Sequence, residues 1–435
     1  MDLEPIGEPD DFLIRLTPDI LPEPDAILVT GITPQRTHLE GIPEHEFLDY
    51  FQDSISILDT IFVGFNTIRF DDEFMRFLHY RNLHDPYEWQ WKDGRSRWDL
   101  LDVVRMTRAL RPEGIKWPFA PDGSRANRLE LLTAINGLEH THAHNALSDV
   151  IGSIEVAKLI KTNQPKLFEY LLSIRDKKSV ASVLSVPVPL VYTSGRYPGE
   201  FEKTTIVIPI GPDKEPGSTL VYDLRTDPVT WLASAELQDS EHPIKPVKHN
   251  RCPAIAPISV MDQESWARIG LNPELINERV SFVRENSTKL AALYKPKFVR
   301  PEAVPLLEIP LEQVDAALYD GFIGGNDKKL LERIRGLSVD ELTDLEATFE
   351  DKRLGGLVFL YKARQYPKSL LAEERIRWEK YLENKFMSDT ENGEYATFMK
   401  RLEELAKLDY LDADKRYILE ELALYGQSIV PSDGY

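Results

Sequence analysis

The spacing of hydrophobic positions changes twice along the chain. Up to about residue 165, short apolar runs that are typical of strands alternate with stretches of helical spacing. The runs predict strands over residues 12–16 and 60–65, the second of them buried. The helical stretches cover residues 35–39, 45–51, 71–80, 98–110, 127–136 and 145–161. Strands that alternate with helices are typical of an α/β domain, which we place over residues 1–165.

Local sequence signals support several of these helices. Thr33 and Pro34 have side chains that are preferred at the N-cap and at the first position of a helix. Gly137 suits the left-handed residue that often ends one. The helix predicted over residues 71–80 is expected to present one apolar face, formed by Phe74, Phe77 and Leu78.

Two further regions follow the α/β domain. Residues 183–191 are rich in valine and proline, and two strands are predicted at 205–210 and 219–223, which indicates a small β-rich module over residues 180–300. Residues 311–429 are mostly charged and have helical periodicity, which indicates a helical domain. We therefore expect three domains, over residues 1–165, 166–302 and 303–435.

The composition excludes several classes of protein. Of the 435 residues, 42% are hydrophobic and 10% aromatic, which is enough for packed cores and excludes wholesale disorder. No stretch approaches the ~18 consecutive apolar residues of a membrane helix. The first residues lack the basic start and apolar core of a signal peptide. Cys252 is the single cysteine, so no disulfide can form within the chain, and we expect a cytoplasmic protein.

Acidic and basic residues are unevenly distributed. The formal net charge of −20 by itself argues against a nucleic-acid partner. Residues 1–60 hold 14 acidic and 2 basic residues, a net charge of −12, whereas residues 61–130 hold 12 basic and 11 acidic residues, a net charge of +1. Ten of those 12 basic residues are arginines. A local surface that attracts phosphate is therefore compatible with the acidic total.

A run of polar residues follows the predicted strand at 60–65 and opens the next helix. It contains Asn66, Asp71, Asp72 and Glu73. From the spacing alone, helix capping is the favoured interpretation, because carboxylates at a helix N-terminus accept hydrogen bonds from free N–H groups and complement the helix dipole. The alternative is metal or substrate chemistry, because open α/β sheets bind ligands at the carboxyl ends of their strands.

Three alternating histidines, His140, His142 and His144, precede the helix predicted at 145–161. They could form a zinc site, but the alternation also suits a loop or a short strand, and no cysteine lies nearby. His144 and Asp149 are the more informative pair, since a helix N-terminus can present an imidazole and a carboxylate toward one point. Such a pair suits a metal-holding carboxylate beside a general base. The plainer alternative is a surface histidine and a solvated carboxylate.

Arginines and aromatic residues are interleaved between residues 69 and 105. Guanidinium groups can hold phosphates and aromatic rings can stack on bases, so such a region suits single-stranded nucleic acid. Some of the aromatic residues must belong to the core instead, and we expect this of Tyr80 and Trp98. The interleaved residues are Arg69, Arg76, Tyr80, Arg81, Tyr87, Trp89, Trp91, Arg95, Arg97, Trp98 and Arg105.

Longer motifs resemble the exodeoxyribonuclease I family, bacterial 3′→5′ exonucleases of the DEDD class that act on single-stranded DNA. In the first domain the resemblance rests on residues 27–35, 66–73, 80–82, 85–87, 96–103, 109–115 and 128–130, and on His144 with Asp149. Beyond it, the matching residues are 252–253, 318–322, 350–353 and 361–364. The resemblance implies a ribonuclease-H-like α/β exonuclease domain, an SH3-like β-barrel and an all-helical C-terminal domain.

The resemblance also implies a set of site residues. In the family, four carboxylates hold two Mg²⁺ ions about 3.5–4 Å apart, and a histidine accepts the proton of the attacking water. By motif position, Asp71 and Asp149 resemble two of the metal-binding carboxylates, and His144 resembles the general base. The residues that resemble substrate-binding positions are Arg128, for a phosphate, and Arg76, Tyr87, Trp91 and Arg105, for the path of the single strand.

One family motif has no match in this sequence. The family's Asp-x-Glu lies on a first strand, upstream of the segment that matches residues 6–9, so we expect the exonuclease domain to be N-terminally truncated and to lack two of the four metal ligands. Asp2 and Glu4 have the literal spacing, but no apolar strand precedes them, and we do not assign them to the motif. Two smaller departures are Asn145, where the family tends to have an aspartate, and Asn127, which replaces a usual aromatic residue.

Two functional hypotheses follow. The first is an Mg²⁺-dependent 3′→5′ exonuclease that degrades single-stranded DNA to mononucleotides in DNA repair and recombination. The second is a catalytically inactive protein that binds single-stranded DNA, because a site with half its ligands should lose most of the metal-assisted rate. The resemblance further implies single-strand DNA-binding protein as a partner and no membrane partner. The family's ring architecture suggests a monomer.

Overall fold

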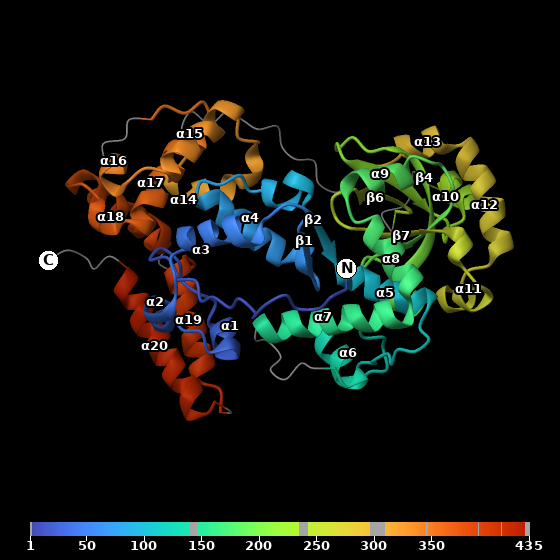
Figure 1. Cartoon of the computed structure of the whole chain (residues 1–435), viewed down its shortest axis with the longest axis horizontal. Helices are drawn as coiled ribbons and strands as arrows, with labels where there is room; N and C mark the ends of the chain where they lie inside the picture. Colours follow the sequence, from blue (N-terminus) through green and yellow to red (C-terminus); the bar gives the residue numbers. More distant parts are fainter. Residues whose placement is uncertain are drawn as a thin grey trace. The chain divides into compact units, whose positions relative to one another are not determined.

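The computed structural model describes residues 2–138, 146–234, 242–295, 309–343, 347–389, 391–409 and 411–430. The chain forms two compact units. The first unit consists of Met1–Glu8, Asp59–Asp71 and Asp93–Val299, and the second of Pro9–Leu58, Asp72–Lys92 and Arg300–Tyr435. Figure 1 shows the elements of both units, coloured along the sequence. Each unit therefore combines segments that are distant in the sequence.

The first unit contains two sheets among its described residues. In one, β1 (Ile61–Gly64) and β2 (Ser96–Asp99) form a parallel pair in which Gly64 lies opposite Asp99. The other sheet is antiparallel and has the strand order β6-β5-β4-β3-β7. Its strands are β3 (Leu190–Thr193), β4 (Thr204–Pro212), β5 (Ser218–Asp223), β6 (Ile244–Lys248) and β7 (Ala254–Pro257).

Helices of the first unit connect these strands and follow them. α5 (Leu100–Leu110) follows β2 directly, because Asp99 both ends the strand and caps the helix. The other helices are α6 (Leu129–Asn136), α7 (Ala146–Asn163), α8 (Pro165–Ser173), α9 (Lys177–Leu184), α10 (Pro228–Ser234), α11 (Gln263–Ile269), α12 (Pro273–Glu285) and α13 (Ser287–Ala292). Short 3₁₀ turns occur at Thr67–Arg69, Lys92–Gly94, Gly199–Phe201 and Ile258–Val260.

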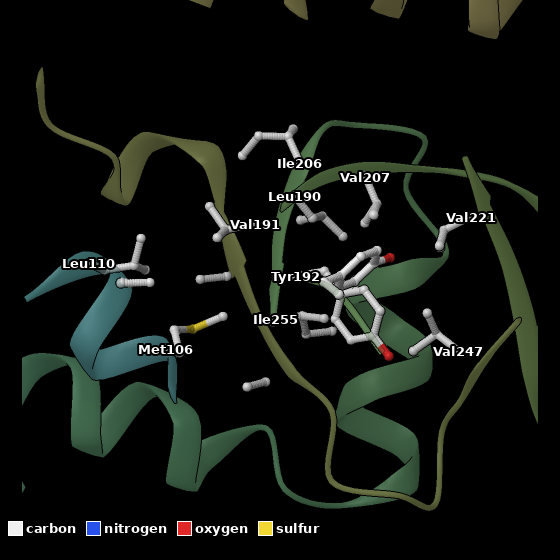
Figure 2. Packing of buried hydrophobic residues seen from close by; sticks show 14 of the residues in the cluster. Met106, Leu110, Leu190, Val191, Tyr192, Ile206, Val207, Val221, Val247 and Ile255 are labelled. Carbon is white, nitrogen blue, oxygen red and sulfur yellow. The ribbon is translucent and has the colours of Figure 1, made fainter. Parts of the chain in front are cut away.

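One hydrophobic core joins α5 to the antiparallel sheet. Figure 2 shows Met106 and Leu110 of α5 beside residues of β3 and β7, among them Val191 and Ile255. All four side chains are almost completely buried. Burial of an aliphatic side chain of this size contributes ~1.5–3 kcal/mol. This core therefore stabilises the contact between the α/β segment and the β-rich region.

The second unit is helical. In Figure 1, α1 and α2 from the start of the chain lie beside α19 and α20 from its end. Its helices are α1 (Pro24–Thr30), α2 (Pro34–Glu40), α3 (Glu44–Tyr50), α4 (Asp71–Arg81, whose first residue belongs to the first unit), α14 (Leu311–Val314), α15 (Gly325–Arg335), α16 (Val339–Thr343), α17 (Lys352–Gln365), α18 (Ala372–Met387), α19 (Glu394–Ala406) and α20 (Ala413–Ile429). Shorter turns occur at Phe51–Ile55, Glu88–Gln90, Asp315–Asp320 and Pro367–Ser369.

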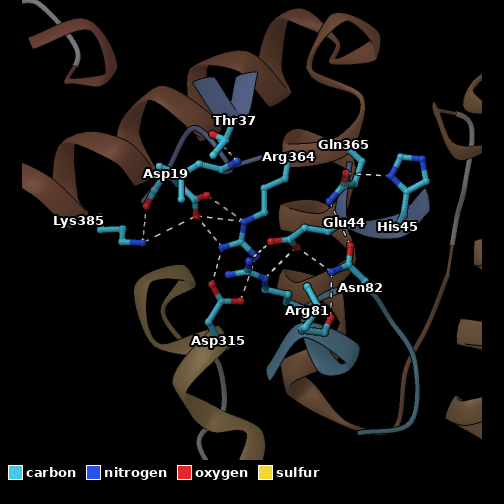
Figure 3. A network of polar contacts seen from close by, with 12 residues as sticks. Asp19, Thr37, Glu44, His45, Arg81, Asn82, Asp315, Arg364, Gln365 and Lys385 are labelled. Atoms are coloured by element: carbon cyan, nitrogen blue, oxygen red, sulfur yellow. Dashed lines mark hydrogen bonds and ion pairs between the residues drawn. The ribbon is translucent and has the colours of Figure 1, made fainter. Parts of the chain in front are cut away.

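A buried network of charged side chains lies inside the second unit (Figure 3). The Arg364 guanidinium of α17 donates to Asp19 Oδ2 from Nη2 at 2.6 Å and from Nε at 3.0 Å, and its Nη1 donates to Asp315 Oδ1 at 3.1 Å. The Tyr381 hydroxyl donates to Asp19 Oδ2 at 2.9 Å, and Lys385 Nζ donates to the Asp19 carbonyl at 2.6 Å. Complete burial opposes the charge of Asp19, but Arg364 and Lys385 outweigh it and lower the pKa of Asp19.

The same network continues around Glu44 of α3 (Figure 3). Arg81 Nε donates to Glu44 Oε2 at 2.9 Å, and Asn82 Nδ2 donates to the same oxygen at 2.8 Å. Gln365 Nε2 donates to Asn82 Oδ1 at 3.1 Å, and Gln365 Oε1 lies 2.9 Å from His45 Nδ1. These contacts attach α3 and the end of α4 to α17. Residues near the start of the chain are thus held by residues more than 280 positions later.

Several predicted elements are confirmed. The Thr33 hydroxyl accepts the Arg36 N–H at 3.2 Å and caps α2, and Gly137 has a left-handed backbone (φ 66°) at the end of α6. The predicted strands in the β-rich region and the predicted helices near the end of the chain are also present. Tyr80 and Trp98 belong to the core, as expected, with 1% and 2% of their surface exposed. Among the described residues, no helix has the length and apolar character needed to cross a membrane.

The predicted strand over residues 12–16 is wrong. Ile14 forms a single bridge with Ile42, in which the Ile42 N–H donates to the Leu13 carbonyl at 2.9 Å. Pairing does not extend past Ile42 because the next donor of a parallel pair lies two residues later, and the chain has already entered α3 at Glu44. The segment that follows leads into α1, a helix that the hydrophobic pattern did not predict.

Three details of the predicted α/β segment also need correction. The helix predicted at 98–110 begins at Leu100, because Trp98 and Asp99 complete β2. β1 is half-buried rather than buried, with Val63 38% exposed. α4 buries a polar face in place of the expected apolar one, and Phe74 is 64% exposed. The residues of α4 that are buried are Asp72, Arg76, His79 and Tyr80.

Candidate active site

The candidate site lies at the carboxyl end of the β1–β2 pair. Because the two strands are parallel, the residues that follow them meet at one edge of the sheet. β1 ends at Gly64, and a tight turn follows in which Asn66 has a left-handed backbone (φ 65°) and Thr67–Arg69 form a 3₁₀ turn. The chain then enters α4 at Asp71. The turn therefore brings Asp71 to the edge at which β2 ends.

Asp99, the last residue of β2, holds this turn in place. Its Oδ1 accepts hydrogen bonds from the N–H groups of Asn66 at 2.8 Å and Leu101 at 2.9 Å. Its Oδ2 accepts the N–H of Ile68 at 3.2 Å. One carboxylate thus caps α5 and fixes the loop before α4. Our sequence analysis gave Asp99 no role and placed it inside a helix predicted over residues 98–110 instead of at the end of a strand.

Asp149 approaches Asp71 from the first turn of α7. Asp71 is exposed as a residue, but its carboxyl group is partly desolvated. This desolvation, followed by the charges of Asp99 and Asp149, raises the pKa of Asp71. Within the described residues, no lysine or arginine forms an ion pair with Asp71. We call Asp71, Asp99 and Asp149 the acidic edge, a concentration of negative charge that a cation would relieve.

The acidic edge fits a divalent cation in its chemistry. Carboxylate oxygens are the hard ligands that Mg²⁺ and Ca²⁺ prefer, and two of the predicted ligands, Asp71 and Asp149, converge here. In the described part of the chain, no group of three or more His, Cys, Asp or Glu side chains is arranged to hold a metal ion. The predicted general base His144 lies outside the described residues, as do His140, His142 and Asn145.

Asp2 and Glu4 lie in an extended segment that forms no strand. Both residues are exposed, and Glu4 Oε1 lies 3.7 Å from Lys158 Nζ of α7. Lys158 is nine residues beyond Asp149, which corresponds to ~14 Å along a helix at 1.5 Å per residue. These positions support our decision not to assign Asp2 and Glu4 to a metal-binding motif.

Two predicted substrate-binding arginines of the first unit differ in exposure. Arg105 Nη1 donates to Asp102 Oδ1 at 2.6 Å, and the Arg105 side chain is 17% exposed. A Cβ atom at Gly195 would lie 2.9 Å from that Nη1, so the absence of a side chain lets the loop after β3 approach Arg105 closely. Arg128, at the start of α6, is 69% exposed and pairs with Glu130. Arg128 is therefore the more accessible of the two to a phosphate.

Arg76 of the second unit is buried among its own partners. Its guanidinium pairs with Glu73 and donates to Gln90 Oε1 at 3.1 Å. The Tyr319 hydroxyl also donates to Glu73. Only 8% of the Arg76 side chain is exposed. In this structure Arg76 fixes the turn that precedes Trp91, and its role toward a substrate stays a prediction.

Two aromatic rings flank that turn in the second unit. Trp91 is 63% exposed, as a ring that stacks on a base should be. Tyr87 is half-buried and packs edge-to-face against Phe322, with ring centroids 5.8 Å apart. Phe322 is 87% exposed, and the sequence analysis did not select it as a site residue. An apolar residue among the glycines of a loop was the signal that could have identified it.

Family models match three successive parts of the chain. A model described as Exonuclease matches residues 2–157, the Exonuclease I SH3-like domain matches residues 175–300, and the Exonuclease I C-terminal domain matches residues 312–429. Together with the similar structures, these matches confirm the predicted fold class, a ribonuclease-H-like exonuclease domain followed by an SH3-like domain and a helical C-terminal domain. The domain limits at residues 165 and 302 stay predictions.

Individual proteins are similar over the same length. Exodeoxyribonuclease I of Escherichia coli K12 is 36% identical over 98% of this chain and 91% of its own. A crystal structure of E. coli Exonuclease I in complex with a dA16 oligonucleotide has a TM-score of 0.88 and 33% identity, and the match covers 99% of this chain and 93% of that chain. A crystal structure of SSB/Exonuclease I in complex with the inhibitor CFAM has a TM-score of 0.85 and 34% identity, with coverages of 99% and 93%.

These similarities extend over the whole chain and are not confined to one common domain. The exonuclease family depends on a divalent metal, and the two carboxylates that converge at the acidic edge, Asp71 and Asp149, have the ligand chemistry that this requires. The chain therefore belongs to the exodeoxyribonuclease I family and is a nuclease.

Proposed function

We propose that this protein hydrolyses single-stranded DNA from the 3′ end and releases mononucleotides, in DNA repair and recombination. The observation that carries the proposal is the acidic edge, at which Asp71 and Asp149 converge beside the carboxyl ends of two parallel strands. The solved complex of a full-length relative with a dA16 oligonucleotide supports single-stranded DNA as the substrate.

The proposed metal is Mg²⁺, and Asp71 and Asp149 are the residues that would hold it. Carboxylates bind this ion together with substrate phosphates in many phosphoryl-transfer sites. When bound, a divalent cation supplies positive charge that stabilises the transition state of phosphodiester hydrolysis. The raised pKa of Asp71 is compatible with this assignment, because partial desolvation and the charges of Asp99 and Asp149 raise it, and a bound cation would stabilise the ionised carboxylate.

The remaining predicted residues bind the strand and move a proton. His144 accepts the proton of the attacking water, as the oxygen of that water bonds to phosphorus and the bond to the 3′ oxygen breaks. The exposed guanidinium of Arg128 binds a phosphate, and Arg105 binds a second phosphate along the strand. The rings of Tyr87 and Trp91 stack on bases.

The overall charge shapes how the strand is bound. With a net charge of −20, general electrostatic attraction to DNA is weak, so affinity depends on local contacts. A solved complex of a relative with single-strand DNA-binding protein, SSB, supports that protein as a partner. Such a partner would bring an acidic nuclease to its substrate.

A second candidate function is binding of single-stranded DNA without cleavage. One observation favours it: in the described residues, no set of three potential ligands is arranged around one metal position. Binding through Arg128 and Trp91 would persist in such a protein. The two functions differ in a single measurable step, the release of nucleotides.

The test is a nuclease assay on the full chain with a 3′-labelled single strand and Mg²⁺. We expect labelled mononucleotides to appear, to disappear when the metal is chelated, and to be absent with Asp149→Asn. The matched control is Asp176→Asn, a capping aspartate of α9 that lies in no predicted site and should leave the rate unchanged. Retention of the labelled strand by the wild-type protein without any release would contradict hydrolysis and support the binding function.

A further inference from the structure

We propose that Asp99 is a positioning residue of the active site, which holds the loop that carries Asp71 to the metal. The proposal rests on the proposed function, because it assumes that Asp71 binds a divalent cation. It goes beyond that function because it assigns a task to a residue that is neither a predicted ligand nor a substrate contact. Its basis is the hydrogen bonding of one carboxylate to two separate elements.

The Asp99 carboxylate accepts hydrogen bonds from two separate elements, the start of α5 and the loop before α4. Oδ1 accepts the N–H of Leu101 at 2.9 Å, which is ordinary N-capping of α5. The same Oδ1 accepts the N–H of Asn66 at 2.8 Å, and Oδ2 accepts the N–H of Ile68 at 3.2 Å. A helix cap alone needs only the first of these bonds. The other two reach residues that are 33 and 31 positions earlier in the sequence.

The loop that Asp99 holds is tightly constrained. A Cβ atom at Gly64 would lie 2.2 Å from Thr67 Cγ2, so the start of the loop tolerates only glycine without a shift. Asn66 has a left-handed backbone (φ 65°), a conformation that asparagine accepts more readily than most residues. Ile68 is buried, with 6% of its surface exposed, so an unpaired N–H at that position would not be hydrated easily.

The register of the strands makes this arrangement possible. Gly64 lies opposite Asp99 in the parallel pair, so the loop begins beside the Asp99 side chain. The loop ends at Asp71, the first residue of α4. The segment between β1 and Asp71 is therefore held at its start by the strand and at Asn66 and Ile68 by the bonds that Asp99 accepts. Residues that orient metal ligands typically change metal affinity or activity 10–100-fold when they are replaced.

Two substitutions separate helix capping from loop positioning. Asp99→Ser keeps a good N-cap for Leu101, but a hydroxyl cannot also span the N–H groups of Asn66 and Ile68. Asp99→Asn keeps the size of the side chain, but the amide has one acceptor oxygen where the carboxylate has two. The control is Asp176→Asn, because Asp176 caps α9 by accepting the N–H groups of Lys178 and Ser179 at 2.9 and 3.0 Å and contacts no part of the loop.

The experiment measures Mn²⁺ binding to the full chain by electron paramagnetic resonance, without DNA, and amide exchange over residues 66–68. We expect Mn²⁺ affinity to fall about 10–100-fold in both Asp99 variants and to stay unchanged in Asp176→Asn. Exchange at residues 66–68 should accelerate in the Asp99 variants only. In nuclease assays, kcat at limiting metal should fall while KM for the strand stays constant, and saturating metal should restore part of the rate.

The outcomes separate the two proposals. If the wild-type protein binds Mn²⁺ and Asp99→Ser binds it equally well, Asp99 does not position Asp71, and the proposed function stands. If the Asp176→Asn control loses as much affinity as the Asp99 variants, the effect is one of general stability, and the positioning role is also overturned. If the wild-type protein binds no Mn²⁺, the proposed function fails, and the positioning role fails with it.

Discussion

The acidic edge of the first unit and the buried network of the second unit use carboxylates in opposite ways. Asp19 is completely buried, yet Arg364 and Lys385 outweigh the effect of burial and lower its pKa. Asp71 is partly desolvated beside Asp99 and Asp149, and its pKa is raised. At Asp19 the neighbouring cations outweigh desolvation, whereas at Asp71 desolvation dominates and the neighbouring carboxylates add to it.

The two regions also differ in what they contribute to the molecule. A buried ion pair adds little net stability, but removing one partner leaves an isolated buried charge at high cost. The network around Asp19 is therefore structural, since it links residues of the early chain to α17 and α18. A cluster of like charges destabilises a fold slightly, and such clusters are found most often at catalytic and binding sites. Substitutions in the two regions should separate activity from stability.

Asp71→Asn should have the largest effect on activity and almost none on stability. Loss of a ligand to the metal removes several kcal/mol of transition-state stabilisation, and we expect kcat to fall by roughly 10³-fold. The free energy of unfolding should change by less than about 1 kcal/mol. Relief of the repulsion from Asp99 and Asp149 offsets the loss of a negative charge at the start of α4. Nuclease assays and urea titrations measure the two quantities.

Activity of Asp71→Asn within a few-fold of the wild-type value would remove Asp71 from the site. Phe74→Ala, one turn along the same helix, is the control for α4 itself. Phe74 is 64% exposed and carries no charge, so its substitution tests whether any change in α4 impairs the enzyme.

Arg364→Met should have the reverse effect, a large loss of stability. The substitution leaves Asp19 buried without its guanidinium partner, which typically costs about 3–5 kcal/mol. Urea unfolding of the variant should show this loss at neutral pH. The double variant Asp19→Asn/Arg364→Met should recover part of it, because no buried charge then lacks compensation.

The control for the network is Arg401→Met. Arg401 pairs with Asp25 at 2.7 Å, but the two side chains are 42% and 45% exposed. Exposed pairs of this kind contribute about 0–1 kcal/mol. Equal losses for Arg364→Met and Arg401→Met would show that burial does not distinguish the network, and the comparison between the two regions would fail.

Protonation of His79 should lower the stability of the second unit at a higher pH than protonation of Asp19 in the buried network does. It is completely buried, and burial lowers the pKa of His79 from 6.5 to about 4. Its Nδ1 lies 2.7 Å from the Met75 carbonyl, and its Nε2 lies 3.1 Å from Gln52 Nε2, so both nitrogens of the neutral ring have partners. The unfolded chain therefore takes up a proton at a higher pH than the folded protein does.

The sign of the effect follows from that difference. The stabilising contribution of His79 is complete above pH 6.5 and is lost progressively as the pH falls toward 4, by about 3 kcal/mol in total. Asp19, whose pKa is lowered, retains its contribution until the pH falls below 3.8. Urea unfolding at pH 7.0, 6.0 and 5.0 measures the slope. His79→Gln should reduce it, and a slope that is unchanged in this variant would assign the pH dependence to other groups.

Local signals in the sequence predicted the elements that depend on local bonds. Thr33 caps α2 through a bond to a residue three positions later, and Gly137 ends α6 through its own backbone conformation. The buried face of α4 could not be predicted in this way. Its polar residues are satisfied by distant partners, Arg76 by Gln90 and His79 by Gln52, and neither partner appears in the apolar periodicity.

The residues of the candidate site differ in the same way: some could be selected from the sequence, and others depend on distant partners. The resemblance to a family selected Asp71 and Asp149, whose roles stay predictions; the charge of Asp149 contributes to the raised pKa of Asp71. The sequence analysis did not select Asp99, because its sequence context is that of an ordinary helix cap. Its two other hydrogen bonds depend on the register of β1 against β2. The sequence analysis did not select Phe322, because Tyr87, the ring that it contacts, is 235 residues earlier in the sequence. Pairings of this kind are set by tertiary structure, so a local signal such as the glycines around Phe322 can suggest the residue but not its partner.

Trp91→Ala tests the smallest expected effect, on substrate binding. An exposed indole that stacks on a base contributes ~1–3 kcal/mol, so the Kd for a single strand should rise roughly 5- to 150-fold while the free energy of unfolding stays constant. Tyr417→Ala is the matched control, since Tyr417 on α20 is similarly exposed, at 61% against 63%, and belongs to no predicted path. Trp91→Phe should retain part of the affinity, because the ring still stacks. An equal Kd for wild type and Trp91→Ala in fluorescence anisotropy would remove Trp91 from the strand path.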